Sequence, residues 1–201
     1  MISQSLSYGY LSIENDLNPQ LEREIPIQHE YEIKRVKVKK DHPLNKLYCE
    51  KVLPEYTETV EHGVLAELEK IFENLKKKER FEINGIPYSP DAIVHRNNAT
   101  ILIEVKTTRS RPGSGKFDQV VHKGAIQAIR NSVAYSIYSG EEVIPKLAVG
   151  IFTKTGEKHA LLEKLRIYRV GWRNEFKITK EIANELYQLF LEVERNEILA
   201  C

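Results

Sequence analysis

The stretch Pro90-Asp-Ala-Ile-Val-His-Arg-Asn-Asn-Ala-Thr-Ile-Leu-Ile-Glu-Val-Lys106 decides the fold, because it predicts two strands joined by a tight turn. A short apolar strand over 92–94 follows Asp91, and the pair Asn97-Asn98 suits a hairpin turn. The segment 100–106 is apolar and rich in β-formers, which is typical of a central strand.

The alternation of side chains along a strand places chemistry on one side of this hairpin. Glu104 and Lys106 share a face, while Val105 points to the other. A hairpin also brings Asp91 beside Glu104. We therefore expect two carboxylates and one ammonium group to converge at one end of the hairpin.

Such a group predicts a metal site. Two close carboxylates repel each other unless a cation lies between them. Mg²⁺ or Mn²⁺ accepts one or two carboxylates together with substrate phosphate, and it can activate a bound water. Lys106 would position that water or stabilise the transition state. The alternative is a surface salt bridge from Lys106 to Glu104 or Asp91, but the complete pattern on an apolar strand favours the metal site.

With Pro90, Asp91, Glu104 and Lys106, this stretch resembles the PD-(D/E)XK nuclease superfamily. The likeness is greatest to archaeal Holliday-junction resolvases, and a weaker one is to RecB-like nucleases, including CRISPR-associated and archaeal-virus members. The resemblance to the superfamily covers residues 63–153. Three segments carry it, namely 63–67, 91–107 and 144–152.

The resemblance implies a restriction-endonuclease-like core that acts on DNA with Mg²⁺ or Mn²⁺. Asp91 and Glu104 would be metal ligands, the Val105 carbonyl an additional ligand, and Lys106 the catalytic lysine. A homodimer would supply the paired sites that a four-way junction requires.

A predicted amphipathic helix over 59–78, with Thr59 as its N-cap, precedes the hairpin and offers further acids. At 100° per residue Glu67 lies at the edge of the apolar stripe, and Glu61 lies nearer its middle at the helix start. The Gly-x-x-x-Glu of the resolvase helix corresponds to residues 63 and 67, so we prefer Glu67 as third metal-binding and catalytic acid. The alternative is an ordinary exposed glutamate. His62 is a rival ligand, because RecB-like nucleases have a helical histidine, but here it faces away from the stripe.

A basic loop follows the hairpin. Arg109, Arg111 and Lys116 occur there with two glycines and no acid, which favours a grip on DNA phosphates. Lys123, a little further along the chain, joins this predicted DNA-binding set. The alternative is a solvated basic loop without a ligand.

A helix predicted over 118–139 is apolar on nearly all sides, so we expect it to be covered twice, the second time by the terminal segments or by another subunit. Gln127 and Asn131 belong to a polar row on it. RecB-like nucleases carry Gln-x-x-x-Tyr in this region, which makes Gln127 a further candidate, although Asn131 stands where the tyrosine would be. A strand over 144–153 and a final helix after Thr179, for packing or dimerisation, complete the prediction.

The bulk composition predicts one globular unit in three parts. The chain has 201 residues, 41% of them hydrophobic, and a net charge of +1, so any DNA contact must be local. We expect an N-terminal extension over 1–59 with strands and a basic arm, a nuclease core over 60–155, and a C-terminal extension over 156–201. The arm contains Lys34, Arg35, Lys37, Lys39 and Lys40. Its alternative role is that of an edge strand protected by lysines.

The two cysteines, Cys49 and Cys201, cannot build a four-cysteine iron–sulfur site, so an iron–sulfur RecB-like nuclease is a poor match. We expect free thiols in a reducing compartment. The N-terminus lacks a signal-peptide pattern, and the apolar run over 143–152 is too short to span a bilayer. These features predict an intracellular, cytoplasmic protein (in the host cytoplasm if viral) without a membrane partner.

The fold expected is therefore α/β (α+β), with a mixed central sheet flanked by helices. The function expected is a divalent-metal-dependent DNA endonuclease acting on Holliday junctions or other branched DNA. Two alternatives stay open, namely a RecB-like single-strand DNA nuclease without an iron–sulfur cluster and a catalytically inactive DNA-binding module.

Overall fold

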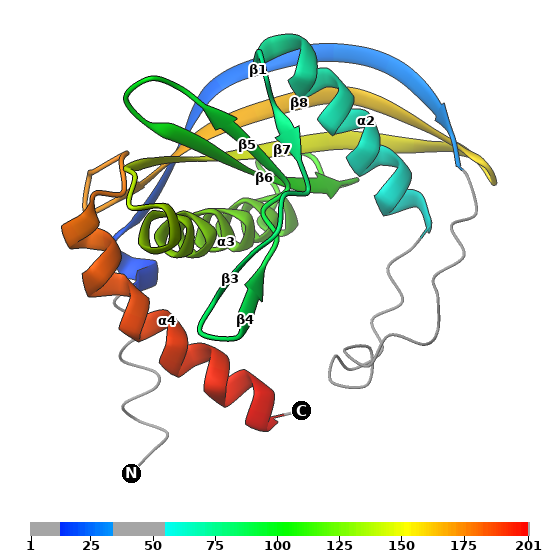
Figure 1. Ribbon diagram of the computed structural model, residues 1–201. Helices are drawn as coiled ribbons and strands as arrows, with labels where there is room; N and C mark the ends of the chain where they lie inside the picture. The colour runs from blue at the N-terminus through cyan, green and yellow to red at the C-terminus, as the bar shows by residue number, and fades with distance from the viewer. Residues whose placement is uncertain (1–12, 34–54, 201) are drawn as a thin grey trace.

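The computed structural model describes residues 13–33 and 55–200, so the basic arm, Cys49 and Cys201 lie outside the described residues. Figure 1 shows the arrangement of its elements. They are β1 (Leu17–Glu32), α2 (Glu55–Ile71), β2 (Lys76–Lys77), β3 (Phe81–Ile83), β4 (Ile86–Tyr88), β5 (Ala92–His95), β6 (Thr100–Thr108), α3 (Gly115–Ser139), β7 (Val143–Gly156), β8 (His159–Trp172) and α4 (Lys180–Ala200).

A six-stranded mixed sheet organises these elements. Its strand order is β1-β8-β7-β6-β5-β2, with β6 and β7 parallel and the other neighbours antiparallel. Helix α2 covers one face of the sheet and α3 the other (Figure 1). The predicted α/β (α+β) class, a mixed central sheet flanked by helices, is confirmed, and the arrangement is consistent with a restriction-endonuclease-like fold.

Strand β6 lies at the centre because almost every residue in it is apolar or buried. Ile101, Ile103 and Val105 pack towards α2, whereas Leu102 packs towards α3. A strand that is covered on both faces reads as a continuous apolar run. Glu104, fully buried within that run, is therefore an exception that requires an explanation.

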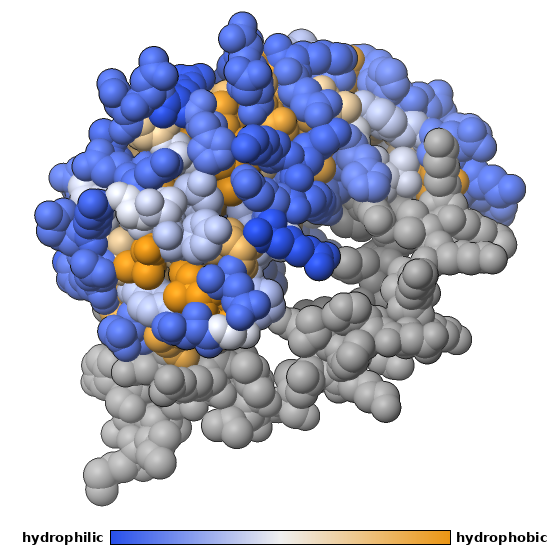
Figure 2. Space-filling model, in the orientation of Figure 1, coloured by the Kyte–Doolittle hydropathy of each residue, from blue (hydrophilic) through white to orange (hydrophobic). Residues whose placement is uncertain are grey.

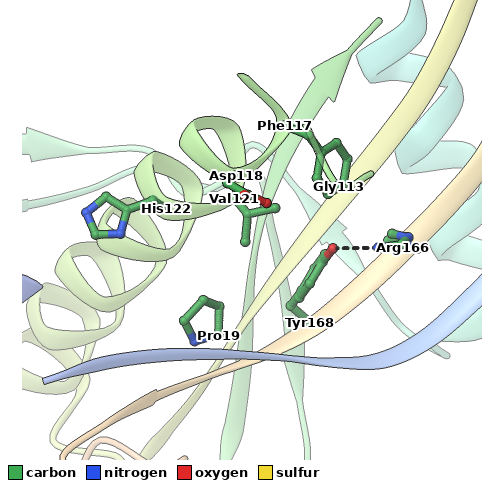
Figure 3. Close-up of a pocket in the computed structure, with 8 residues that line it drawn as sticks. All are labelled: Pro19, Gly113, Phe117, Asp118, Val121, His122, Arg166 and Tyr168. Atoms are coloured by element: carbon green, nitrogen blue, oxygen red, sulfur yellow. Dashed lines mark hydrogen bonds between the residues drawn. The ribbon is translucent and has the colours of Figure 1, made fainter. Parts of the chain in front are cut away.

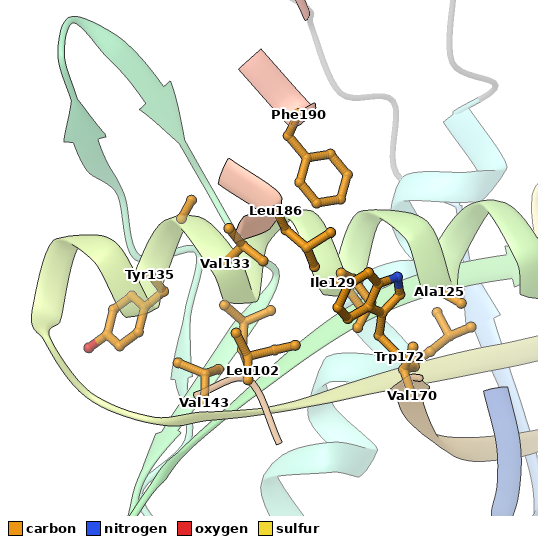
Figure 4. Packing of buried hydrophobic residues seen from close by; sticks show 14 of the residues in the cluster. Leu102, Ala125, Ile129, Val133, Tyr135, Val143, Val170, Trp172, Leu186 and Phe190 are labelled. Atoms are coloured by element: carbon orange, nitrogen blue, oxygen red, sulfur yellow. The ribbon is translucent and has the colours of Figure 1, made fainter. Parts of the chain in front are cut away.

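The larger of the two cores lies between the sheet and the pair α3 and α4. Figure 4 shows Trp172 and Val170 of β8 facing Ile129 of α3, with Leu186 and Phe190 of α4 on the far side of that helix. Helix α3 is thus covered twice, as its composition predicts, and within the described residues α4 and the β3–β4 hairpin provide the second cover. A second subunit stays a prediction.

Helix α3 begins three residues earlier than predicted because the sequence caps it there. The Ser114 side chain accepts a hydrogen bond from the Phe117 N–H, and Gly140 ends the helix in a left-handed conformation with φ 73°. At the other end of the chain Thr179 accepts from the Ile182 N–H, as predicted for the start of α4.

The long strands β1 and β8 belong to the predicted terminal extensions, yet both join the central sheet. Strand β1 forms its edge next to β8, with bulges between Leu21 and Arg23 and between Pro26 and His29. The extensions therefore supply two of the six strands.

The prediction of one helix over 59–78 is wrong at both ends. Helix α2 begins at Glu55, so Thr59 lies inside it, and it ends at Ile71. Asn74 then takes a left-handed φ of 59°, and Lys76 and Lys77 pair with β5 as a short edge strand. Lysine is a good helix former, but the open edge of β5 offers backbone hydrogen bonds that outweigh this local preference.

The segment 81–87 precedes Asp91 and contains the turn pair Asn84-Gly85, which predicts a first strand of the core sheet, but it does not join that sheet. Its turn is present, because Asn84 and Gly85 have φ of 49° and 80°, as a two-residue hairpin turn requires. However, β3 and β4 pair only with each other within the described residues and form a separate sheet. Phe81 packs against Tyr135 of α3 instead.

The surface seen in Figure 2 is mostly hydrophilic, and its hydrophobic residues form small separate groups, one of them over α4. Among the described helices, none has the length and apolar character that crossing a membrane demands.

Candidate metal and nucleic-acid site

The β5–β6 hairpin places Asp91 beside Glu104. Ala92 pairs with Ile103, so the residues immediately outside this pair, Asp91 and Glu104, face each other across the hairpin. The Val105 N–H donates to Asp91 Oδ2 at 2.7 Å, which holds the carboxylate against β6. Val105 thus contacts Asp91 through its N–H, and ligation by its carbonyl stays a prediction.

Glu104 is a buried carboxylate that its surroundings satisfy only in part. The Asn131 amide of α3 donates to Glu104 Oε1, while Oε2 has no hydrogen-bond partner among the described residues. Burial raises the pKa of Glu104 well above its ordinary value, and the negative charge of Asp91 raises it further. The hydrogen bond from Asn131 and the positive charge of Lys106 act in the opposite direction. A second cation beside Oε2 would favour the ionised form.

Lys106 is held by α3 in the same way. Its Nζ donates to Gln127 Oε1 at 2.6 Å. Positions four apart on a helix are separated by about 6 Å along its axis, and positions two apart on a strand by about 6.6 Å. The spacing of Gln127 and Asn131 on α3 therefore matches that of their partners on β6. Gly124, one turn earlier, lets the two elements approach, because a Cβ there would lie 3.0 Å from Lys106 Cγ.

Lys78 brings a third acid to the site. Its Nζ lies 3.1 Å from Asp91 Oδ1 and also contacts Glu61 Oε1 of α2. The Lys78 backbone N–H donates to the Asp91 carbonyl at 3.0 Å, so main chain and side chain are both fixed to the same residue. Glu61 is therefore connected to Asp91 through one ammonium group.

Glu67, the preferred third acid, has different neighbours. Its Oε1 lies 2.9 Å from Lys70 Nζ one turn along α2. Burial raises the pKa of Tyr31 of β1, and the charge of Glu67 raises it further, which places Glu67 close to that ring. His62 is exposed on α2. Of the helical candidates, the structure connects Glu61 to Asp91.

The predicted phosphate-binding residues lie at the surface. Arg109, Lys116 and Lys123 are exposed, the first in the loop after β6 and the others on α3. Arg111 is exposed too, but its guanidinium pairs with Glu163 of β8 at 2.5 Å. Within the described residues three of the four predicted cations form no ion pair, while the fourth, Arg111, is neutralised by Glu163.

The donor set fits a hard divalent cation. Asp91 and Glu104 supply oxygens from neighbouring positions, and Glu104 Oε2 is buried without a partner among the described residues. Mg²⁺ requires only one or two carboxylates, with water and phosphate completing its shell. In the part of the chain that the structure describes, no group of three or more His, Cys, Asp or Glu residues is placed to hold a metal. A site of two carboxylates completed by substrate does not require a group of three such residues.

A cavity of about 340 Å³ lies on the same face of the sheet, next to the start of α3 (Figure 3). Arg166 and Tyr168 of β8 line it together with Phe117 of α3, and Figure 3 shows the hydrogen bond from Arg166 to the Tyr168 hydroxyl. Arg166 also binds Glu24 of β1 at 2.6 Å. Its cation is therefore already paired, and the cavity lies two strands away from β6.

Two residues of the site escaped sequence reasoning. The sequence places Asn131 in the polar row of α3 and sets it apart from a tyrosine motif, and its spacing of four from Gln127 is the signal that could have assigned it to the site. Lys78 was assigned to the end of a helix, and no sequence pattern places it at Asp91.

Comparisons with known proteins do not show a family. No family model matches the chain, and no curated protein matches it. A solved structure titled "Crystal structure of SSO0001" is similar with 20% identity and a TM-score of 0.33, over 70% of this chain. The match spans 61% of that structure's chain. A likeness of this extent carries no argument about activity.

Proposed function

We propose that this protein is a divalent-metal-dependent DNA endonuclease of the PD-(D/E)XK type, which hydrolyses phosphodiester bonds with Mg²⁺ or Mn²⁺. One observation carries the proposal, namely that Asp91, Glu104 and Lys106 lie together at one end of the β5–β6 hairpin. The buried Oε2 atom of the glutamate has no partner there among the described residues. Two adjacent carboxylates, one of them buried with an unpartnered oxygen, favour a cation between them, because leaving that oxygen unpaired costs about 1–3 kcal/mol.

Each residue of the site has a distinct task in this proposal. Asp91 and Glu104 would hold the metal, which when bound activates water and neutralises phosphate charge. The Val105 N–H holds the Asp91 carboxylate against β6, and Asn131 fixes Glu104 through Oε1, which would leave Oε2 for a metal. Gln127 holds the Lys106 ammonium on the same face as Glu104, where it can orient the attacking water or contact the phosphate.

The surface cations would give affinity rather than chemistry. Arg109 follows β6 directly and Lys116 and Lys123 lie on α3; all three are exposed and would contact phosphates that flank the bond to be cut. With a net charge of only +1, the chain relies on this local set. Branched DNA bound by a homodimer is the substrate form that we favour.

A second candidate, a RecB-like single-strand nuclease, is supported by the contact between Gln127 and Lys106. That contact gives the polar row of α3 a place in the site. Four-way junction, duplex and single-stranded DNA, each end-labelled, distinguish the two when incubated with Mg²⁺, Mn²⁺ or EDTA. Symmetric cuts in the junction support the first candidate, and cutting of single strands supports the second.

The variants Asp91→Asn and Glu104→Gln keep the shape of each side chain and remove its charge. Both are expected to lose cleavage while DNA affinity is retained. Glu69→Gln is the matched control, because Glu69 lies on α2 and pairs with Lys77, not with Lys78 or the site. Equal cleavage by all four proteins would refute the proposal, and DNA binding without any cleavage by the wild type would identify a non-catalytic DNA-binding module.

A further inference from the structure

The position of Lys78 between two acids suggests a role for it in metal binding. Its Nζ is 3.1 Å from Asp91 Oδ1 and contacts Glu61 Oε1, so one ammonium group bridges a carboxylate of the sheet edge and a carboxylate of α2. A divalent cation at Asp91 would need the same oxygen atoms. Two cations cannot occupy that position together, because like charges at contact distance repel strongly.

The backbone at Lys78 is itself unusual. Lys78 has a backbone φ of 52°, in the left-handed region that residues other than Gly, Asn and Asp rarely adopt. Such a conformation is strained and persists only where its surroundings impose it. Here the Lys78 N–H donates to the Asp91 carbonyl at 3.0 Å, so the main chain is held where the side chain can reach Asp91.

The Lys78 side chain is also able to leave. It is 48% exposed, in contrast to the buried Glu104. A lysine has a flexible four-carbon stem, and its ammonium is well hydrated in water. Lys106 differs in this respect, because it is half-buried and bound to Gln127 of the long helix α3.

We propose that Lys78 and a divalent cation compete for Asp91 and Glu61, so that Lys78 holds the metal-free site together and sets its metal affinity. Metal binding releases the ammonium to solvent and leaves Glu61, rather than Glu67, as the helical acid of the site. This inference rests on the proposed function for the assignment of Asp91 and Glu104 as metal ligands.

Binding of Mn²⁺ to the DNA-free protein tests the competition directly. The measurement is the loss of the electron paramagnetic resonance signal of free Mn²⁺ on titration. Lys78→Met is expected to bind Mn²⁺ about tenfold more tightly than the wild type, and Glu61→Gln to bind it more weakly. Lys77→Met is the matched control, because Lys77 is the adjacent residue and pairs with Glu69. It should leave the affinity unchanged, as should Glu67→Gln.

The release of Lys78 has a second readout that does not depend on substitution. The rate at which an amine-reactive acetylating reagent modifies each lysine is measured by mass spectrometry with and without Mg²⁺. Modification of Lys78 should accelerate with Mg²⁺, and that of Lys77 should not. If Lys78→Met does not fold, Lys78→Gly replaces it, since glycine suits a φ of 52°.

The outcomes separate this inference from the proposed function. Unchanged Mn²⁺ affinity in Lys78→Met, with binding lost in Glu104→Gln, would overturn the competition and leave the metal site standing. Failure of both wild type and Lys78→Met to bind Mn²⁺ would overturn the two together. Tighter binding with faster modification of Lys78 would support both.

Discussion

Replacing Glu104 by glutamine should make the metal-free protein more stable, although it should abolish cleavage. Glutamine keeps an oxygen that can accept from Asn131, and it turns the unpartnered Oε2 into an N–H donor near the Asp91 carboxylate. A buried group without a partner costs about 1–3 kcal/mol, so we expect a gain of that size. For a chain of this length a gain of 2 kcal/mol raises the unfolding temperature by about 4–8 °C.

The gain should depend on pH with a definite sign. The pKa of Glu104 is raised by burial and by Asp91, so the folded protein holds this proton more tightly than the unfolded chain does. The wild type therefore has its full stability below the ordinary pKa of 4.5 and loses stability as the pH rises towards the raised value. The advantage of Glu104→Gln should be small at pH 4 and greatest above the raised pKa.

Thermal unfolding in EDTA, followed by circular dichroism at pH 4 and pH 8, measures this difference. Glu67→Gln is the control, because Glu67 pairs with the exposed Lys70 and should change stability by less than about 0.5 kcal/mol. If Glu104→Gln unfolds at a lower temperature than the wild type at pH 8, the ionised Glu104 stabilises the fold without a metal, and its assignment to a metal site fails.

Four further variants examine the surface and the core around the site. Gly124→Ala should destabilise the protein by about 1–3 kcal/mol in urea unfolding, because its Cβ would lie 2.5 Å from Leu147 Cδ1. Arg109→Ala should lower DNA affinity and reduce its salt slope by about one, whereas Arg111→Ala should do less because Arg111 is already paired; equal slopes would remove this loop from the interface. Trp172→Ala should cost about 3–5 kcal/mol, and a smaller loss would mean that the core around it collapses.

The sequence was sufficient for the part of the site that depends on local periodicity. Alternation along 100–106 assigns Glu104 and Lys106 to one face, and the turn residues set the register that brings Asp91 to Glu104. Both rules act over a few residues, so they need no knowledge of the rest of the fold.

The contacts of Lys78 and Asn131 could not be predicted in the same way. A run of three lysines after an amphipathic stripe favours a helix, yet the edge of β5 takes Lys76 and Lys77 into the sheet and leaves Lys78 at Asp91. Asn131 contacts Glu104 because of the position at which α3 lies along β6. The close packing of Gly124 against Leu147 fixes that position. These are long-range packing effects that no window of sequence contains.

The pairing of β1 with β8 has a consequence for how the chain is made. Glu24 and its partner Arg166 are 142 positions apart, so β1 leaves the ribosome long before the strand that it joins. At about 5–20 residues per second, β1 waits roughly 7–30 s during synthesis. Its prolines and alternating charges, such as those in Leu21-Glu-Arg-Glu24, keep a strand without its neighbour from pairing with other nascent chains. Strand β8 must then insert between β7 and this waiting strand.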